Sequence, residues 1–244
     1  MDPELALDIK GLKKVYQSGT VAVDGIDLAI PKGEFFGLLG PNGAGKSTTI
    51  HCVVGIAKPT EGSIHISGTD VVKDHREARK KAGLAPQEFN FEFFGPVRKT
   101  LDYIAGYYGL PKKERTERLD ELLERFALTE HADKQFRELS GGLKRRVMLI
   151  RAVIHDPELV IFDEPTAGVD VELRHDLWRY MEALNKEGKT VILTSHYLEE
   201  IERLCRRIAV INKGVIVAEG SREEFTRNGR LEDTYLKITK GEEW

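Results

Sequence analysis

The sequence predicts an α/β fold with a parallel-sheet core, and three observations support this prediction. Two short apolar runs, LVIF at 159–162 and VIL at 191–193, are each followed by a helical pattern. Runs that are apolar on both faces are typical of strands buried in a parallel sheet. Further β-like runs precede residue 70, and helical spacing dominates from about residue 98 to 155. We therefore expect βαβ units that carry a small sheet and a helical insertion.

The N-terminal part contains four β-like runs separated by turns. They are LALDI (5–9), VAVDGIDLAI (21–30), EFFGLLG (34–40) and SIHISG (63–68). Turn residues Pro31, Lys32 and Gly33 close the second run. We interpret these runs as a small antiparallel β subdomain layered on the core.

The middle of the chain has helical periodicity in TLDYIAGYYGL, ERTERLDELLERFAL and GGLKRRVMLIRAVIH. The charge-rich second stretch predicts a solvated helix face, and its apolar residues are expected to point inward: Leu119, Leu122, Leu123 and Phe126. We divide the chain into a core with its β subdomain at 1–86 and 159–220, a helical subdomain at 87–158, and a short C-terminal segment at 221–244.

The composition excludes several classes of function. A net charge of −3 provides no general attraction for a polyanion, so nucleic acid is not an expected partner. Cys52 and Cys205 are too few for a disulfide framework and are expected to be buried apolar residues in a reducing compartment. No run approaches the ~20 apolar residues of a membrane-spanning helix, and the N-terminal residues lack the apolar core of a signal peptide.

The stretch GPNGAGKST at 40–48 follows a predicted strand and opens a predicted helix, the context in which a phosphate loop occurs. Its glycines let the backbone approach a phosphate and direct N–H groups at it. Lys46 is expected to reach the β- and γ-phosphates, Ser47 to bind Mg²⁺, and Thr48 to lie at an anion-favouring helix N-terminus. The expected ATP-binding residues are Gly40, Pro41, Asn42, Gly43, Ala44, Gly45, Lys46, Ser47 and Thr48.

Two adjacent acids, Asp163 and Glu164, follow the buried run at 159–162. They therefore stand at the carboxyl end of a parallel strand, where such sheets bind ligands. We expect Asp163 to hold Mg²⁺ and Glu164 to act as the general base on the attacking water.

A second glycine-rich stretch, LSGG at 139–142, opens the predicted helix that runs towards His155. Phosphoryl transfer requires charge stabilisation from several directions, which one phosphate loop cannot supply. The free N–H groups and hydroxyl of Ser140, Gly141 and Gly142 are expected to form a second anion cradle.

The phosphate loop, the LSGG stretch and the acid pair, in this order, resemble the ATP-binding cassette (ABC) family over essentially the whole chain. The resemblance implies a P-loop NTPase (RecA-like) core, ATP and Mg²⁺ as ligands, and ATPase activity. It also implies a head-to-tail dimer in which the LSGG stretch contacts the ATP of the opposite subunit, so the second cradle serves another copy. A small-molecule P-loop kinase would leave the LSGG stretch and His196 unexplained.

Four more residues match positions of the family's motifs. Tyr16 resembles the aromatic residue that stacks on adenine, although a half-buried strand tyrosine is the alternative. Gln87, in LAPQE, resembles the glutamine that reaches the metal and the water. Asp170, in TAGVD, resembles the loop that crosses the dimer interface, and His196 resembles the switch histidine at the γ-phosphate.

The chain departs from the common pattern at Leu143, where the family usually has glutamine. The cradle survives because it uses backbone groups and a serine hydroxyl, so ATPase activity is expected to remain. The three basic residues that follow, Lys144, Arg145 and Arg146, are compatible with a solvated helix face or with a nearby anion.

TAGVDVELR and the C-terminal stretch resemble ATPase subunits of exporters of drug, lipid or polysaccharide type. The resemblance implies a separate membrane permease as partner and a cytoplasmic location at the inner face of the cell membrane. Phe89, Phe91, Phe93 and Phe94 follow Gln87, where the family docks its permease; they are expected to be anchors for the permease or core residues. The rival function is a soluble ABC-type ATPase in DNA repair or translation.

Overall fold

The computed structural model describes residues 4–89, 95–227 and 229–242. Its central element is a six-stranded sheet in the order β10-β9-β3-β8-β7-β6. The strands are β3 (Phe35–Leu39), β6 (Ala82–Ala85), β7 (Leu159–Asp163), β8 (Thr190–Thr194), β9 (Arg207–Asn212) and β10 (Val215–Ser221). Neighbours from β9 to β6 are parallel, and β10 pairs antiparallel with β9. The predicted α/β fold with a parallel core is therefore confirmed.

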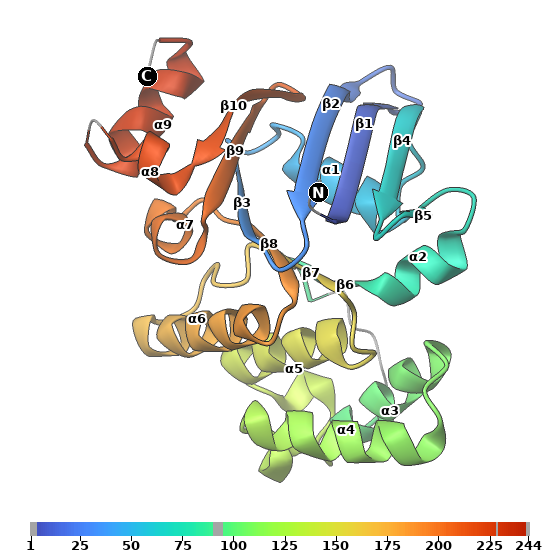
Figure 1. Ribbon diagram of the computed structural model, residues 1–244. Helices are drawn as coiled ribbons and strands as arrows, with labels where there is room; N and C mark the ends of the chain where they lie inside the picture. Colours follow the sequence, from blue (N-terminus) through green and yellow to red (C-terminus); the bar gives the residue numbers. More distant parts are fainter. Residues whose placement is uncertain (1–3, 90–94, 228, 243–244) are drawn as a thin grey trace.

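A four-stranded antiparallel sheet, in the order β2-β1-β4-β5, lies beside this core (Figure 1). Its strands are β1 (Leu5–Val15), β2 (Val21–Pro31), β4 (Glu61–Ile66) and β5 (Thr69–Asp70). Three of the four runs assigned to this sheet from the sequence belong to it, but the run at 34–40 does not. It forms β3, between β8 and β9 of the core sheet. All five residues of β3 are buried, whereas β2 alternates buried and exposed residues, as a strand with one solvated face does.

The helical segment between β6 and β7 forms the lower part of the molecule in Figure 1. It contains α3 (Val97–Tyr107), α4 (Lys112–Arg125), α5 (Gly141–Val153) and two short 3₁₀ helices at Thr129–His131 and Phe136–Glu138. All four side chains that the sequence directs inward are buried: Leu119, Leu122, Leu123 and Phe126. Their i, i+3, i+4, i+7 spacing places them on one helix face, which packs on the rest of the segment.

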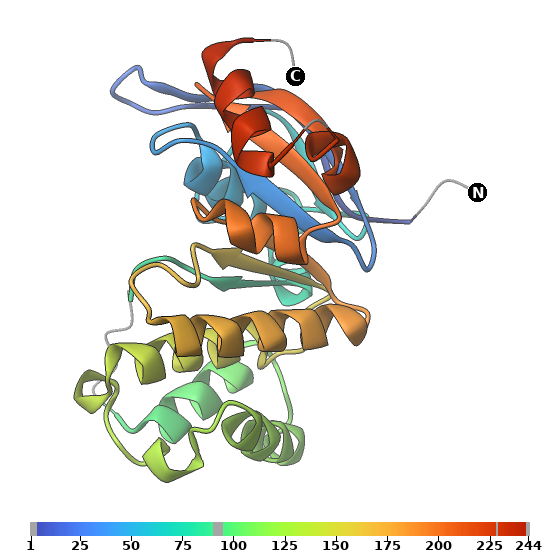
Figure 2. The same cartoon turned by 90° about the vertical axis from the view of Figure 1, so that its left-hand side faces the viewer.

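The remaining helices cover the sheet and the C-terminal end. They are α1 (Lys46–Val53), α2 (His75–Lys81), α6 (Val171–Lys186), α7 (Leu198–Leu204), α8 (Arg222–Phe225) and α9 (Leu231–Lys240). Figure 2 shows α6 running along the boundary between the core strands and the helices α3 to α5. Helix α9 packs on α7, α8 and β9.

The hydrophobic core has two parts on opposite faces of the central sheet. Along β7, Val160 and Phe162 join the cluster on the helical side, and Leu159 and Ile161 join the cluster under the small sheet. This alternation follows from the two-residue period of a strand. Cys52 and Cys205 are free and buried, as expected from the sequence.

Candidate functional site

The functional motifs follow strands that end at the same edge of the central sheet. The phosphate loop follows β3, the acid pair ends β7, Ser195 and His196 follow β8, and Gln87 lies two residues after β6. Parallel strands bring their carboxyl ends together, so loops that are distant in sequence share one edge. The candidate site therefore draws on four loops.

The phosphate loop turns sharply at Gly45, which precedes α1 and has φ +111°. A Cβ at this position would lie 2.5 Å from the Ala22 carbonyl oxygen, so the loop can take this path only with glycine. Helix α1 then begins at Lys46, and its first N–H groups are available at the loop.

The Lys46 side chain folds back over the loop. Its Nζ donates hydrogen bonds to the carbonyl oxygens of Gly40 at 2.7 Å and Pro41 at 3.1 Å. Burial lowers the pKa of Lys46, while the charges of Glu164 and Asp163 raise it. No ion pair of Lys46 with a carboxylate is formed within the described residues. A buried ammonium with only carbonyl partners suits an incoming anion, which fits the phosphate-binding role expected of it.

Thr194, at the end of β8, fixes the acid pair. Its hydroxyl donates to Asp163 Oδ1 at 2.6 Å and accepts a hydrogen bond from the Glu164 backbone N–H at 3.0 Å. Glu164 has φ +48°, a left-handed backbone conformation that is energetically unfavourable for residues other than glycine. The hydrogen bonds to Thr194 hold it there and aim its carboxylate away from the strand.

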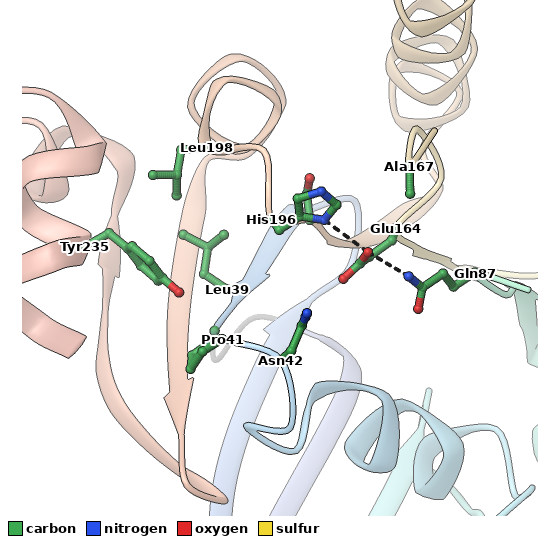
Figure 3. A pocket seen from close by; sticks show the side chains of 11 residues that line it. Leu39, Pro41, Asn42, Gln87, Glu164, Ala167, His196, Leu198 and Tyr235 are labelled. Atoms are coloured by element: carbon green, nitrogen blue, oxygen red, sulfur yellow. Dashed lines mark hydrogen bonds and ion pairs between the residues drawn. The ribbon is translucent and has the colours of Figure 1, made fainter. Parts of the chain in front are cut away.

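Gln87 and His196 both bind the Glu164 carboxylate, as Figure 3 shows. Gln87 Nε2 donates to Oε2 at 2.9 Å, and His196 Nδ1 lies 3.0 Å from the same oxygen. Because a carboxylate only accepts, His196 carries its proton on Nδ1 in this arrangement. The two donors use one oxygen, and within the described residues no hydrogen bond is formed to Oε1. That oxygen remains available to a further donor such as water.

Two cavities open at Glu164. A cavity of about 370 Å³ is lined by Leu39, Gly40, Pro41, Asn42, Gln87, Glu164, Ala167, Ser195, His196, Leu198 and Tyr235 (Figure 3). A second cavity of about 360 Å³ follows the phosphate loop and is lined by Ala22, Asn42, Gly43, Ala44, Gly45, Lys46, Ser47, Thr48, Gln87 and Glu164. The structure thus brings Gln87 and Glu164 to the boundary of the phosphate-loop cavity.

Tyr16 projects towards this loop from the end of β1. Its hydroxyl lies 3.4 Å from Thr48 Oγ1, the ammonium of Lys14 lies 5.1 Å from its ring centroid, and the residue is 41% exposed. Tyr16 thus lies directly after β1, partly exposed and beside the phosphate loop, and its role towards adenine stays a prediction.

The second cradle and Asp170 lie elsewhere in the chain. Ser140 caps α5, accepting a hydrogen bond from Leu143 N at 3.3 Å, and Asp170 caps α6, accepting one from Leu173 N at 2.8 Å. Neither Asp170 nor the stretch 140–142 lines the two cavities at Glu164. Within the described residues of one chain, the two glycine-rich stretches therefore do not meet at either of these cavities.

Arg145 corrects one interpretation of the basic residues in α5. It is 3% exposed, its Nη1 donates to the Pro86 carbonyl at 3.1 Å, and its guanidinium lies 5.0 Å from the Phe89 ring centroid. Burial lowers its pKa, while Asp163 and Glu164 raise it. A solvated face is therefore wrong for Arg145, which ties α5 to the segment that carries Gln87.

Neighbouring residues differ from Arg145. Arg146 forms an ion pair with Asp176 at 3.0 Å, and the Lys144 ammonium lies 5.8 Å from the Phe136 ring centroid.

The site also contains Thr194, Ser195 and Tyr235, which no sequence pattern singled out. A threonine and a serine at a strand end were detectable through the adjacent His196, but nothing in the sequence places Tyr235 of α9 in a cavity with Glu164.

Comparison with known proteins decides the family. A family model described as ABC transporter matches residues 23–167. The chain belongs to the ABC transporter family. It is 43% identical over 219 residues to the Nod factor export ATP-binding protein I of Paraburkholderia xenovorans, covering 90% of this chain and 72% of that protein. The protein of the same name from Rhizobium sp. is 43% identical over 218 residues, covering 89% and 71%.

Solved ABC structures agree in fold. The structure of an ATP-binding subunit of an ABC transporter has a TM-score of 0.88 to this chain and 28% sequence identity, and the match covers 96% of this chain and 99% of that one. The dimeric bacterial ABC transporter cassette MJ0796 has a TM-score of 0.81 and 28% identity, and covers 88% and 98%. This chain is thus an ATPase of the ABC family with a P-loop NTPase core. No helix in the part of the chain that the structure describes is long and apolar enough to cross a membrane.

Proposed function

We propose that this ABC ATPase binds ATP and Mg²⁺ at the phosphate loop and hydrolyses ATP with Glu164 as general base. The observation that carries this assignment is the pair of hydrogen bonds from Gln87 and His196 to Glu164 Oε2, beside the loop that holds Lys46. A carboxylate held by one oxygen presents the other to a water in a defined direction.

The residues present fit Mg²⁺ with a nucleotide. Mg²⁺ keeps several waters and takes one or two carboxylates together with substrate phosphates, so it needs no all-protein cage. Ser47 and Asp163, with Gln87, would hold the ion, which would neutralise charge developing on the phosphates. Lys46 adds a fixed positive charge, Glu164 accepts the proton of the attacking water, and Gln87 and His196 keep its carboxylate oriented.

We further propose that the active unit is a head-to-tail pair of copies. Ser140, Gly141 and Gly142 begin a helix of 13 residues and lie outside the cavities at Glu164. In the pair, this helix N-terminus and the Asp170 loop of one copy would complete the nucleotide site of the other. Tyr16 would stack on the adenine, and the dimeric state of the MJ0796 cassette supports this arrangement.

Complementation between two inactive variants tests the shared site. Lys46→Ala removes the phosphate-loop charge, and Ser140→Arg blocks the second cradle, so each variant alone should lose ATP hydrolysis. A mixed pair contains one site with an intact Lys46 and an intact Ser140. Mixing the two proteins should therefore restore Mg²⁺-dependent phosphate release, which should rise more than linearly with protein concentration.

The control is a mixture of either single variant with the double variant Lys46→Ala/Ser140→Arg. No pair in such a mixture contains an intact site, so it should stay inactive. If mixtures of the single variants remain as inactive as their components, while wild-type protein hydrolyses ATP, each site is built within one chain and the shared-site proposal is wrong.

We propose export as the transport direction and a separate membrane permease as the partner. The relatives named above are export proteins, whereas nothing in the comparisons favours a role in DNA repair or translation. The chain would then act at the cytoplasmic face of the membrane. The candidate docking surface is a cavity of about 750 Å³ between α3 and the core, lined by His51, Val54, Gly55, Ile56, Arg79, Ala82, Leu84, Pro86, Tyr103, Ile104, Tyr107, Tyr108, Arg151 and His155.

Exposed apolar side chains surround this groove. Tyr107 is 77% exposed, Tyr103 is 68% exposed and Ile56 is 66% exposed. Exposed apolar surface of this kind marks a site for a partner. Phe91, Phe93 and Phe94, proposed as anchors from the sequence, lie outside the described residues. Phe89 is partly exposed and packs edge-on against Phe136, with ring centroids 6.2 Å apart.

A further inference from the structure

Glu200 of α7 is a buried acid to which the proposed mechanism of ATP hydrolysis assigns no role. It is 0% exposed, and it accepts a hydrogen bond from the hydroxyl of Thr166, which is also 0% exposed. Thr166 stands two residues after Glu164, and Glu200 stands four residues after His196. One hydrogen bond thus joins the loop of the general base to the segment of the histidine that holds it.

Burial of the Glu200 carboxyl group is unfavourable, because the group loses its hydration. Burial raises its pKa, while the side chains of Thr166, Ser195 and Trp178 and the charge of Arg174 lower it. Within the described residues, its Oε2 has no hydrogen-bond partner. An apolar side chain of similar size would fill this position without desolvating a carboxyl group. A structural role in packing alone therefore does not explain a glutamate here.

Glu200 contacts both sides of the site, through its carboxylate with the Thr166 hydroxyl and through its backbone N–H with the Tyr197 carbonyl. On the Thr166 side, Ala167 N donates to the Glu164 carbonyl and Val169 N donates to the Thr166 carbonyl, each at 3.3 Å, which makes a tight turn after the strained Glu164. This turn leads directly to the Asp170 cap of α6.

On the histidine side, Tyr197 N donates to Ser195 Oγ at 2.9 Å, and Glu200 N donates to the Tyr197 carbonyl at 3.1 Å. His196 projects from this turn with its side chain 46% exposed, so its packing alone does not fix it. Its orientation depends on the backbone that Glu200 anchors.

We propose that Glu200 is a positioning residue for ATP hydrolysis, which through Thr166 and the Ser195 turn holds Glu164 and His196 at hydrogen-bonding distance. It does not touch the nucleotide, since it is wholly buried and lines neither cavity at Glu164. The inference rests on the proposed function and assigns a new residue to it. Loss of the Thr166 to Glu200 hydrogen bond releases the two loops from each other and lowers the turnover rate without weakening ATP binding.

Two matched pairs of variants in the full-length chain test this role. Thr166→Val and Glu200→Met remove the donor or the acceptor at nearly constant shape, whereas Thr166→Ser and Glu200→Gln retain them. The first pair should lower kcat by roughly tenfold with KM for ATP unchanged, the effect of one lost hydrogen bond on a transition state. The second pair should stay within about threefold of wild type in kcat. Thr166→Val combined with Glu200→Met should be no slower than either single variant, because both remove the same interaction.

Thermal unfolding of every variant separates positioning from stability. Unchanged kcat in both Thr166→Val and Glu200→Met overturns the inference. So does a loss of kcat in the double variant that equals the product of the two single losses. A loss of kcat that parallels a loss of melting temperature in all four single variants also overturns it. If Glu200→Met does not fold, the comparison of Thr166→Val with Thr166→Ser decides the question by the same criteria. A wild-type protein without ATPase activity would instead refute the proposed function itself.

Discussion

Glu164 combines a strained backbone with a carboxylate held from two sides. Its positive φ is tolerated because Thr194 binds its N–H, and Gln87 and His196 bind its side chain. Strain of this kind is sustained only where surrounding contacts over-determine the conformation. The same contacts direct the free oxygen, so conformation and chemistry have one cause.

Replacement of Glu164 by glutamine should lower ATP hydrolysis by roughly 10²–10⁴-fold, because the amide keeps the shape but cannot accept the proton. ATP binding should persist, and the unhydrolysed nucleotide should hold two copies together. Single-turnover phosphate release and size-exclusion chromatography with ATP measure the two effects.

Normal hydrolysis by the Glu164→Gln protein would show that another group is the base. Loss of both hydrolysis and ATP binding would show that the substitution damages the phosphate loop. The assignment of Glu164 as the general base would then have no support.

At the scale of elements, β6 packs directly against α5. A Cβ on Gly83 of β6 would lie 1.8 Å from the Ala152 carbonyl oxygen of α5, so the strand and the helix touch through their backbones. His155, just after α5, completes this contact. Its Nε2 lies 3.0 Å from the Ala82 carbonyl oxygen, and its ring stacks on Tyr108 with centroids 3.8 Å apart. Because a carbonyl only accepts, Nε2 carries the proton, and the buried Nδ1 has no partner within the described residues.

This packing makes stability depend on pH. Burial lowers the pKa of His155 from 6.5 to about 4, against a smaller raising effect of the Ala82 hydrogen bond. Between these two values the unfolded chain binds a proton that the folded chain excludes. The contribution of His155 to the free energy of unfolding is therefore fully present above pH 6.5 and decreases by about 3 kcal/mol as the pH drops to 4, at about 1.36 kcal/mol for each pH unit.

His155→Gln retains a donor for Ala82 but does not titrate, so its stability should change less over this pH range. Urea unfolding of wild type and variant at pH 7, 5.5 and 4.5 measures the difference. His75→Gln, at an exposed position at the start of α2, should follow the wild-type pH dependence. If His155→Gln loses stability with falling pH as steeply as wild type does, other groups carry the effect.

At the scale of the whole molecule, α3 to α5 and the core enclose the groove that contains Tyr107, and the two cavities at Glu164 lie at the carboxyl edge of the sheet. Arg145 spans the two regions, since it extends from α5 to the Pro86 carbonyl, next to Gln87. A partner in the groove would therefore contact elements that are packed directly on the proposed hydrolysis site.

Tyr107→Glu should abolish co-purification with the permease from detergent-solubilised membranes, because it places a charge on the apolar rim of the groove. Its thermal stability should remain within about 0.5 kcal/mol of wild type, as for most exposed positions. Val217→Glu, on β10 at the other end of the molecule and 42% exposed, is the matched control and should retain the permease. Equal retention by both variants would place the docking surface elsewhere.

The sequence by itself determined the parts of this protein that depend on neighbouring residues. The phosphate loop at 40–48, the acid pair after 159–162 and the inward face of α4 are local patterns, because a turn, a strand end or a helix face is defined within a few residues. Only the tertiary structure decided contacts that depend on strand order. The run at 34–40 lies in the core sheet, and Arg145 points inward. Gln87 and His196, which are 77 and 32 residues from Glu164 in the sequence, both contact one of its carboxylate oxygens. Residue spacing carries no information about which loops meet at a shared sheet edge, since that follows from how strands distant in the chain pair and bury their side chains.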